Sequence, residues 1–360
     1  MKTLLLGDVC PTAVNYHLFR QQDIQTLFTD TVSLFEGCDY SVVNLECALT
    51  ESQNPIHKIG GNQKAPAQTA RVLKDLGVDL CALSNNHIMD FGEEGIRDTI
   101  RTLEENGLAH TGFGENYADS RKNFLLEKNG ERICLITVCE HEYCYATEER
   151  MGARPYDEYD TMEDIAAAKK TADRVIVLYH GGKEYCRYPS PRLRKLCRAM
   201  VRRGADLVLC QHSHCIGAYE AYEGGHILYG QGNFHYTEPC PHEVWYTGLA
   251  VHYDTLANTV EFTPIRAFDY HIELAKDGKE IMDAFRKRCE SLQDGTWRQE
   301  WRAFCESVRP NYRNAVRKAF VDGASARDDE MFGHYLDCEA HSDVWRELYA
   351  TWWHTDPPKT

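Results

Sequence analysis

The chain has 360 residues, of which 55 are acidic and 40 basic, and its formal net charge at pH 7 is −15. A surface this acidic repels nucleic acids and anionic membranes, so neither is an expected partner. No apolar run reaches the ~18 residues of a membrane-spanning helix. The apolar run 4–6 is also too short for the core of a signal peptide, so we expect a cytoplasmic protein.

Short apolar segments that end on polar residues alternate with amphipathic segments over the first 265 residues. Strands are predicted at residues 3–8, 40–46, 80–83, 131–139, 174–182, 205–209 and 226–234. Helices are predicted before Gly77, before Gly107 and over residues 191–203. This alternation indicates an α/β fold with helices on both faces of a sheet. Residues 131–139 and 248–265 look antiparallel, which favours a mixed sheet or two packed sheets.

From about residue 270 the composition changes. Segments 281–292, 297–308, 312–323 and 343–355 show helical spacing of apolar residues. We therefore predict two parts, a main domain over residues 1–268 and a helical C-terminal extension over residues 269–360 that packs on it.

Polar side chains follow five of the predicted strands. The residues are Asp8, Glu46, the Asn86–His87 pair, His180, and the His212/His214 pair. In open α/β sheets, the carboxyl ends of strands converge on one crevice, where ligands bind. On an extended segment His212 and His214 would point to the same face, although such a pair alone is more often an ordinary surface feature. Together, these nitrogen and oxygen donors suit divalent transition metals such as Zn, Mn or Fe.

The 15 cysteines form no C-x-x-C pair, and an odd number cannot all be paired in disulfides. We interpret them as reduced, mostly buried thiols. A metal cluster of Cys134, Cys139 and Cys144 is disfavoured, because their spacing does not match a zinc knuckle.

Several motifs together resemble a known family. They are GDVC at 7–10, NLECALT at 44–50, residues 64–92, residues 95–116, HGGKEY at 180–185, GADLVLCQHSH at 204–214 and YGQGNF at 229–234. The series resembles the bacterial capsule-synthesis CapA (poly-γ-glutamate, PGA_cap) family of the calcineurin-like metallophosphoesterase superfamily. The resemblance implies a four-layered α/β/β/α sandwich around a dinuclear metal site, here with a C-terminal helical extension.

The resemblance also implies roles for the polar residues at the strand ends. Asp8 and His214 would bind the first metal, and Glu46 would bridge both metals. The second metal would be held by Asn86, His180 and His212. His87 would act as the general acid, with its ring held by Asp90.

Other residues are expected around the substrate. Lys64 could contact the far end of an anion, and Glu184 and Tyr185 match the family's pocket motif. Asn44 would orient the loop that carries the ligands, and Asn233 lies in a tight loop expected on the pocket wall.

The function expected from the resemblance is a metal-dependent hydrolase that carries one or two ions of Mn, Zn or Fe. Its substrate would be a small or polymeric anion, either a phosphoester or a γ-glutamyl chain. The alternative is a non-catalytic accessory protein that binds poly-γ-glutamate or supports its synthesis. The sequence does not choose between these substrates, and it does not predict an oligomeric state.

Three positions and one segment depart from the family pattern. Cys10 occupies the place of a metal-binding histidine in related phosphoesterases, and we expect it to be a buried thiol rather than a ligand. Gly181 replaces a tryptophan, which should open the pocket beside His180. Gly230–Gln231 occupies the place where the family often has Ser-Leu, so we expect this loop to differ from that of the family. The family's N-terminal membrane anchor is not found, which puts a role in capsule synthesis in doubt.

Overall fold

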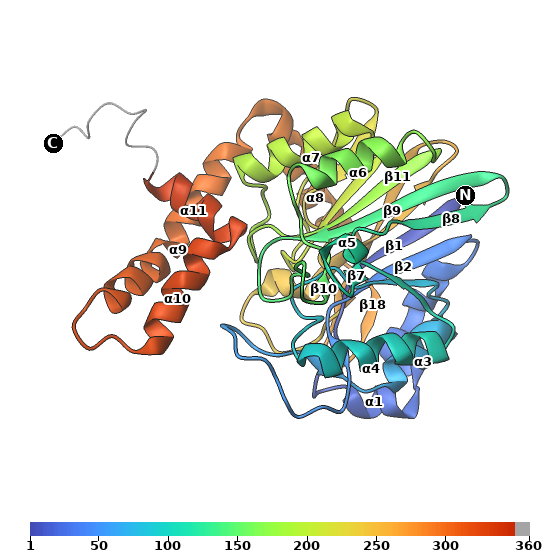
Figure 1. Cartoon of the computed structure of the whole chain (residues 1–360). Coiled ribbons are helices and arrows are strands. Elements are labelled where there is room, and N and C mark those ends of the chain that lie inside the picture. Colours follow the sequence, from blue (N-terminus) through green and yellow to red (C-terminus); the bar gives the residue numbers. More distant parts are fainter. Residues whose placement is uncertain (350–360) are drawn as a thin grey trace.

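The computed structural model describes residues 1–349 and contains two β-sheets that pack face to face (Figure 1). The first sheet runs in the order β18-β17-β16-β1-β2-β5-β6, and β15 pairs with β1. Strands β1, β2, β5, β6 and β15 are parallel, whereas β16, β17 and β18 are antiparallel. The strand bounds are β1 Lys2–Val9, β2 Tyr40–Leu45, β5 Leu80–Ala82, β6 Ala109–Thr111, β15 Asn233–His235, β16 Thr247–Asp254, β17 Thr259–Ala267 and β18 Ile272–Leu274.

The second sheet has six strands in the order β13-β14-β12-β11-β9-β8. Its four central strands are parallel, and both edge strands are antiparallel to their neighbours. The strand bounds are β8 Phe124–Lys128, β9 Glu131–Cys139, β11 Arg174–His180, β12 Leu207–Gln211, β13 Tyr219–Tyr222 and β14 Gly225–Leu228. Two further sheets have two short strands each. One pairs β3 Ala48–Leu49 with β4 Lys64–Ala65, and the other pairs β7 Phe113–Gly114 with β10 Gly152–Ala153.

The central strands are apolar on both faces, and neighbouring residues enter different cores. Leu5 lies in the core between the two sheets, whereas Leu4 and Leu6 lie in the core under the helices of the first sheet. In the second sheet, Ile176 faces the first sheet and Val175 faces the outer helices. Successive strand residues point to opposite faces, so a strand covered on both sides must be a continuous apolar run. Burial of one such side chain stabilises the fold by about 1.5–3 kcal/mol.

Helices cover the outer face of each sheet. Helices α1 Tyr16–Gln21, α2 Ile24–Phe28, α3 Gln68–Leu76 and α4 Gly92–Glu105 contribute to the core of the first sheet, and α6 Asp160–Ala168 and α7 Pro191–Arg203 contribute to that of the second. Short helices occupy Tyr117–Ser120 (α5), Thr29–Phe35 (η1) and Glu243–Tyr246 (η2). The predicted four-layered α/β/β/α sandwich is confirmed.

The C-terminal helices begin after β18. They are α8 Gly278–Asp294, α9 Trp297–Ala319, α10 Ala326–Asp337 and α11 Glu339–Tyr349. Helix α8 packs on β17 and β13, whereas α9, α10 and α11 form a group at one side of the sandwich (Figure 1). Trp297, Trp301 and Tyr312 of α9 share a core with Leu196 of α7, which joins this group to the sandwich.

The predicted helical extension is therefore present, with two corrections. Strand β18 lies within the range predicted as helical, and α9 continues through Pro310 as one helix where two segments were predicted. The end of the last predicted segment, residues 350–355, lies outside the described residues. A domain boundary at residue 268 stays a prediction. Among residues 1–349, no helix combines the length and the apolar character needed to cross a bilayer.

Candidate functional site

The six predicted metal ligands come from the carboxyl ends of parallel strands in both sheets. Asp8 lies near the end of β1 and His180 is the last residue of β11, whereas Glu46 directly follows β2. Asn86 follows β5 at a distance of four residues, and His212 and His214 follow β12. All six are buried.

The structure brings these six side chains together. Asp8, Glu46 and His180 form one group of potential ligand atoms within 4.8 Å of one another, and Glu46, His212 and His214 form a second. The Oδ1 atom of Asn86 lies 2.9 Å from His180 Nε2. Glu46 belongs to both groups, as a bridging ligand would. The resemblance, however, placed His180 with His212 rather than with Asp8, so the division of ligands between two ions stays a prediction.

Unpartnered polar atoms test whether this cluster suits a metal. Both carboxylate oxygens of Glu46 and the Nδ1 atom of His212 are buried without a hydrogen-bond partner. Glu46 Oε1 faces His180 Nε2 at 3.3 Å. A buried carboxylate without a partner costs several kcal/mol, and a cation would remove that cost. The donor set therefore fits a divalent metal.

Burial and mutual charge shift the ionisation of these residues. Burial and the neighbouring Asp8 raise the pKa of Glu46 to about 8. Burial lowers the pKa of His180 to about 4 and that of His212 to about 3, so both rings are neutral donors at pH 7. For His214, the attraction of Glu46 and Asp8 outweighs burial and raises the pKa to about 10. A metal that binds His214 must therefore displace a proton.

Two asparagines hold ligand side chains in place. Asn44 Nδ2 donates to Asp8 Oδ1 at 2.8 Å and lies 3.2 Å from His180 Nδ1. Asn233 Oδ1 lies 2.8 Å from His214 Nδ1. Neither residue lines the cavity described below. The contact of Asn44 with Asp8 agrees with the orienting role expected for it, and a contact of either asparagine with a substrate stays a prediction.

The loop that carries His212 and His214 is not extended. His212 has φ 76° and His214 has φ 50°, both in the left-handed region that favours glycine. The prediction of an extended H-x-H segment is therefore wrong, although both rings do reach Glu46. Holding a non-glycine residue in a sparsely populated backbone region costs about 1–3 kcal/mol, and such residues concentrate at functional sites.

A cavity of about 820 Å³ opens beside the cluster. Asn86, His87, His212 and His214 line one side of it, together with the expected Glu184 and Tyr185. The opposite side is formed by the C-terminal helices, including Tyr312, His334 and His341.

Lys64 does not line this cavity. Its Nζ donates to the Ser52 carbonyl at 2.5 Å and lies 4.9 Å from the centre of the Phe91 ring. A contact between Lys64 and the far end of an anionic substrate therefore stays a prediction, and this placement of Lys64 does not support it.

His87 is oriented by a buried network. Its Nδ1 atom lies 2.7 Å from Asp90 Oδ2 and 3.2 Å from Lys58 Nζ. Asp90 is fully buried, and it also accepts from Lys58 Nζ at 2.5 Å and from the backbone N–H of Gln63 at 2.6 Å. The carboxylate is therefore fixed and holds the ring in one orientation. Because Nδ1 is engaged, Nε2 is the ring nitrogen left for the cavity.

Sequence reasoning missed several of these residues. Lys58 lies in the segment 50–63, which has no helix or strand and gave no signal. Lys183 and Glu142 also line the cavity. Glu142 follows β9 as the ligands follow their strands, so the strand-end pattern could have identified it.

Gly181 does not open the cavity. The side chain of Glu140 fills the space that a Cβ atom at Gly181 would need, with Glu140 Cγ at 2.5 Å. Glu140 is held there by the backbone N–H of Gly182 at 2.8 Å and by the Tyr179 hydroxyl at 2.6 Å. The replacement of a tryptophan by Gly181 thus accommodates a buried carboxylate.

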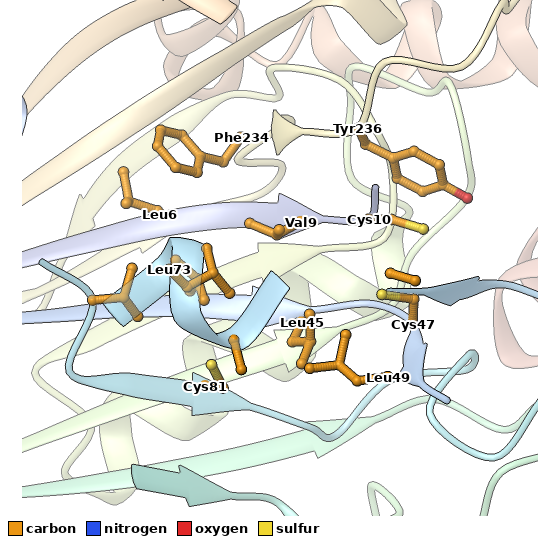
Figure 2. Packing of buried hydrophobic residues seen from close by; sticks show 14 of the residues in the cluster. Leu6, Val9, Cys10, Leu45, Cys47, Leu49, Leu73, Cys81, Phe234 and Tyr236 are labelled. Carbon is orange, nitrogen blue, oxygen red and sulfur yellow. The ribbon is translucent and has the colours of Figure 1, made fainter. Parts of the chain in front are cut away.

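Cys10 lies in the hydrophobic core at the end of β1, near Val9, Cys47 and Tyr236 (Figure 2). It belongs to neither group of potential ligands around Glu46. All 15 cysteines are free, and most are buried.

Comparisons with known proteins agree on one family. The profile described as "Bacterial capsule synthesis protein PGA_cap" matches residues 2–237. The chain is 29% identical to "Capsule biosynthesis protein CapA" of Bacillus anthracis, over 64% of this chain and 58% of that protein. It is 30% identical to "PGA biosynthesis protein CapA" of Bacillus subtilis, over 64% of this chain and 61% of that protein.

A third relative is the "Probable polyglutamine synthesis accessory protein MT0602" of Mycobacterium tuberculosis. It is 29% identical over 54% of this chain and 55% of that protein. The chain thus spans less than two thirds of the length of each of these relatives.

Proposed function

The chain belongs to the PGA_cap family of bacterial capsule synthesis proteins, and from that premise we propose that it is a metal-dependent hydrolase that cleaves an anionic substrate by phosphoesterase-type chemistry. The observation that carries the proposal is the unpartnered carboxylate of Glu46, buried among Asp8 and three imidazoles beside a large cavity. Asp8, Glu46, Asn86, His180, His212 and His214 would hold the metal. The chemistry that a divalent metal supplies in such a site is Lewis acidity toward an anionic oxygen and activation of water.

His87 supports catalysis rather than binding alone. It lines the cavity, belongs to neither ligand group and is held through Nδ1 by Asp90. A histidine in this position is suited to protonate a leaving group from Nε2. The buried Asp90 fixes the orientation of the ring, and Lys58 and the Gln63 backbone keep Asp90 in place.

A second candidate function is an accessory role in poly-γ-glutamate synthesis without catalysis. The names of the relatives favour it, because two are called biosynthesis proteins and one an accessory protein. In that case, the cavity would bind a γ-glutamyl chain and His87 would have no chemical step to perform.

One panel of assays separates the two candidates. The purified protein is incubated with a chromogenic phosphodiester, a phosphomonoester and a γ-glutamyl oligomer, each with Mn²⁺ or Zn²⁺ and each with chelator. We expect metal-dependent turnover of a phosphoester that chelator abolishes. Binding of the γ-glutamyl oligomer without turnover of any of the three compounds would favour the accessory role.

A further inference from the structure

A second cluster of metal-binding side chains joins the sandwich to the C-terminal helices. Glu142 lies in the loop after β9, His334 lies in the last turn of α10, and Cys338 directly follows α10. Their ligand atoms all lie within 4.8 Å of one another. None of the three belongs to the groups around Glu46, so the two clusters share no ligand.

The surroundings of these side chains leave their ligand atoms poorly satisfied. Among the described residues 1–349, the one side chain that hydrogen-bonds to the Glu142 carboxylate is Cys338, whose Sγ lies 3.2 Å from Glu142 Oε1. Within residues 1–349, no basic side chain forms an ion pair with Glu142. Burial raises the pKa of this carboxyl to about 7, as expected for a carboxylate without a cation.

His334 and Cys338 are also suited to bind a metal. The His334 ring contacts Tyr143 and His341 by stacking or edge packing, and burial lowers its pKa to about 4, so the imidazole is neutral at pH 7. Cys338 is only 4% exposed, and its Sγ also lies 2.9 Å from the His141 carbonyl oxygen, a second acceptor for its single proton. The two residues are four apart, which is the spacing that places side chains on one face of a helix end.

We infer that Glu142, His334 and Cys338 form a second, zinc-type metal site. Sulfur, imidazole and carboxylate are the donors that Zn²⁺ takes in proteins, and three protein ligands leave one position for water. On binding, the Cys338 thiol releases its proton to solvent and coordinates as the thiolate. Besides the contact of the Tyr143 and His334 rings, these segments are joined by the Glu339 carboxylate, which accepts from the His141 backbone N–H at 2.7 Å. A metal at this position would fasten α10 to the loop after β9, at the wall of the cavity that His87 also lines.

Co²⁺ provides a test that does not depend on activity. A Co²⁺–thiolate bond gives a charge-transfer absorption in the near ultraviolet, whereas the Glu46 cluster offers only oxygen and nitrogen donors. We expect the full-length protein loaded with Co²⁺ to show this absorption, Cys338→Ser to lose it, and Cys305→Ser to keep it. Cys305 is the matched control, because it is buried in α9 and belongs to none of the potential ligand groups.

Three further measurements keep the inference falsifiable. Glu46→Gln should retain the absorption, since it alters only the first cluster. His334→Gln should weaken it, and zinc analysis should show one equivalent less in Cys338→Ser than in Cys305→Ser. Absence of the absorption in the unaltered protein would overturn the inference whatever the folding of the variants. If the absorption persisted in Cys338→Ser and was lost in Cys10→Ser, Cys10 would be the thiolate ligand. That result would also overturn the inference.

Discussion

The sandwich and the C-terminal helices border the same cavity, but they contribute to it in different ways. The sandwich supplies Glu46 and the five polar side chains around it, which lie at or shortly after the ends of buried strands. The helices supply side chains such as Tyr312 and His341. These helices follow residue 237 in the sequence, where the match to the family profile ends.

Under the proposed function, the sandwich would carry the reacting groups and the helices would enclose the substrate. Substitutions in the sandwich should change metal binding and turnover. Substitutions in the helices should change how well a substrate is held, because they leave the ligands untouched. The predictions below test that division.

Removal of the shared carboxylate should have the largest effect. Glu46→Gln replaces the one residue common to both ligand groups, so we expect loss of bound metal and of hydrolysis. The metal-free variant should be at least as stable as the metal-free parent protein, because a buried carboxyl group without a hydrogen-bond partner has been replaced. Elemental analysis and thermal unfolding with and without Zn²⁺ measure both effects. Unchanged metal content in Glu46→Gln would contradict the assignment.

His87→Gln should lower turnover by about 10²–10⁴-fold, the usual contribution of a positioned acid or base. Metal content should remain that of the parent protein, since His87 belongs to neither ligand group. Steady-state kinetics on the best substrate of the panel, with metal analysis, provide the measurement. Loss of metal from this variant would show that His87 is a ligand.

Asn233→Ala should weaken metal binding by about 10–100-fold, the range found when a residue that orients a ligand is removed. The cause is the loss of the contact with His214 Nδ1. Titration with Zn²⁺ against a competing chelator measures the affinity, and Asn314→Ala, an exposed position on α9, is the control. Equal affinities for the two variants would argue against an orienting role.

Tyr312→Phe tests the helical side of the cavity. It removes a hydroxyl that lies 2.6 Å from His341 Nδ1, and a net hydrogen bond of about 0.5–1.5 kcal/mol corresponds to a change of about 2- to 10-fold. We expect KM to rise by this factor while kcat and metal content stay near the parent values. Tyr253→Phe, which loses a hydroxyl contact to Asn258, is the control. A fall in kcat without a change in KM would contradict the assignment of substrate binding to the helices and of turnover to the sandwich.

Cys10→Ser should have the smallest effect. Cys10 packs in the core with Val9 and Cys47 and belongs to no ligand group (Figure 2), so metal affinity should be unchanged at the Glu46 cluster. Zn²⁺ titration measures it, and selective loss of one ion from that cluster would make Cys10 a ligand.

The sequence was informative where buried strands end in polar side chains. Apolar runs such as the one around Leu5 predicted strands covered on both faces, and the residues that follow them predicted the cluster around Glu46. The pattern did not reveal Lys58, because a loop residue that pairs with Asp90 carries no periodic signal. The hydrogen bond of the Lys64 ammonium to the Ser52 carbonyl was not foreseen for a related reason, because the sequence does not show where strand β4 directs this side chain.

The helices show a second limit of sequence reasoning. Helix α10 was not predicted, and it contains no fully buried residue. Without a buried apolar stripe, a helix lacks the periodicity by which it can be recognised. Its capping box at Ser325 and Asp328 was the available signal.

The arrangement of the ligands across two sheets has a consequence for folding. Asp8 and His214 lie far apart in the sequence, and roughly 10–40 s separate their synthesis at about 5–20 residues per second. Contacts between such distant segments form late, because loop closure must precede them. A strand that emerges first therefore carries an incomplete set of donors until the second sheet has docked. A metal held at Glu46, as proposed, would therefore meet its full set of donors only after the two sheets have docked.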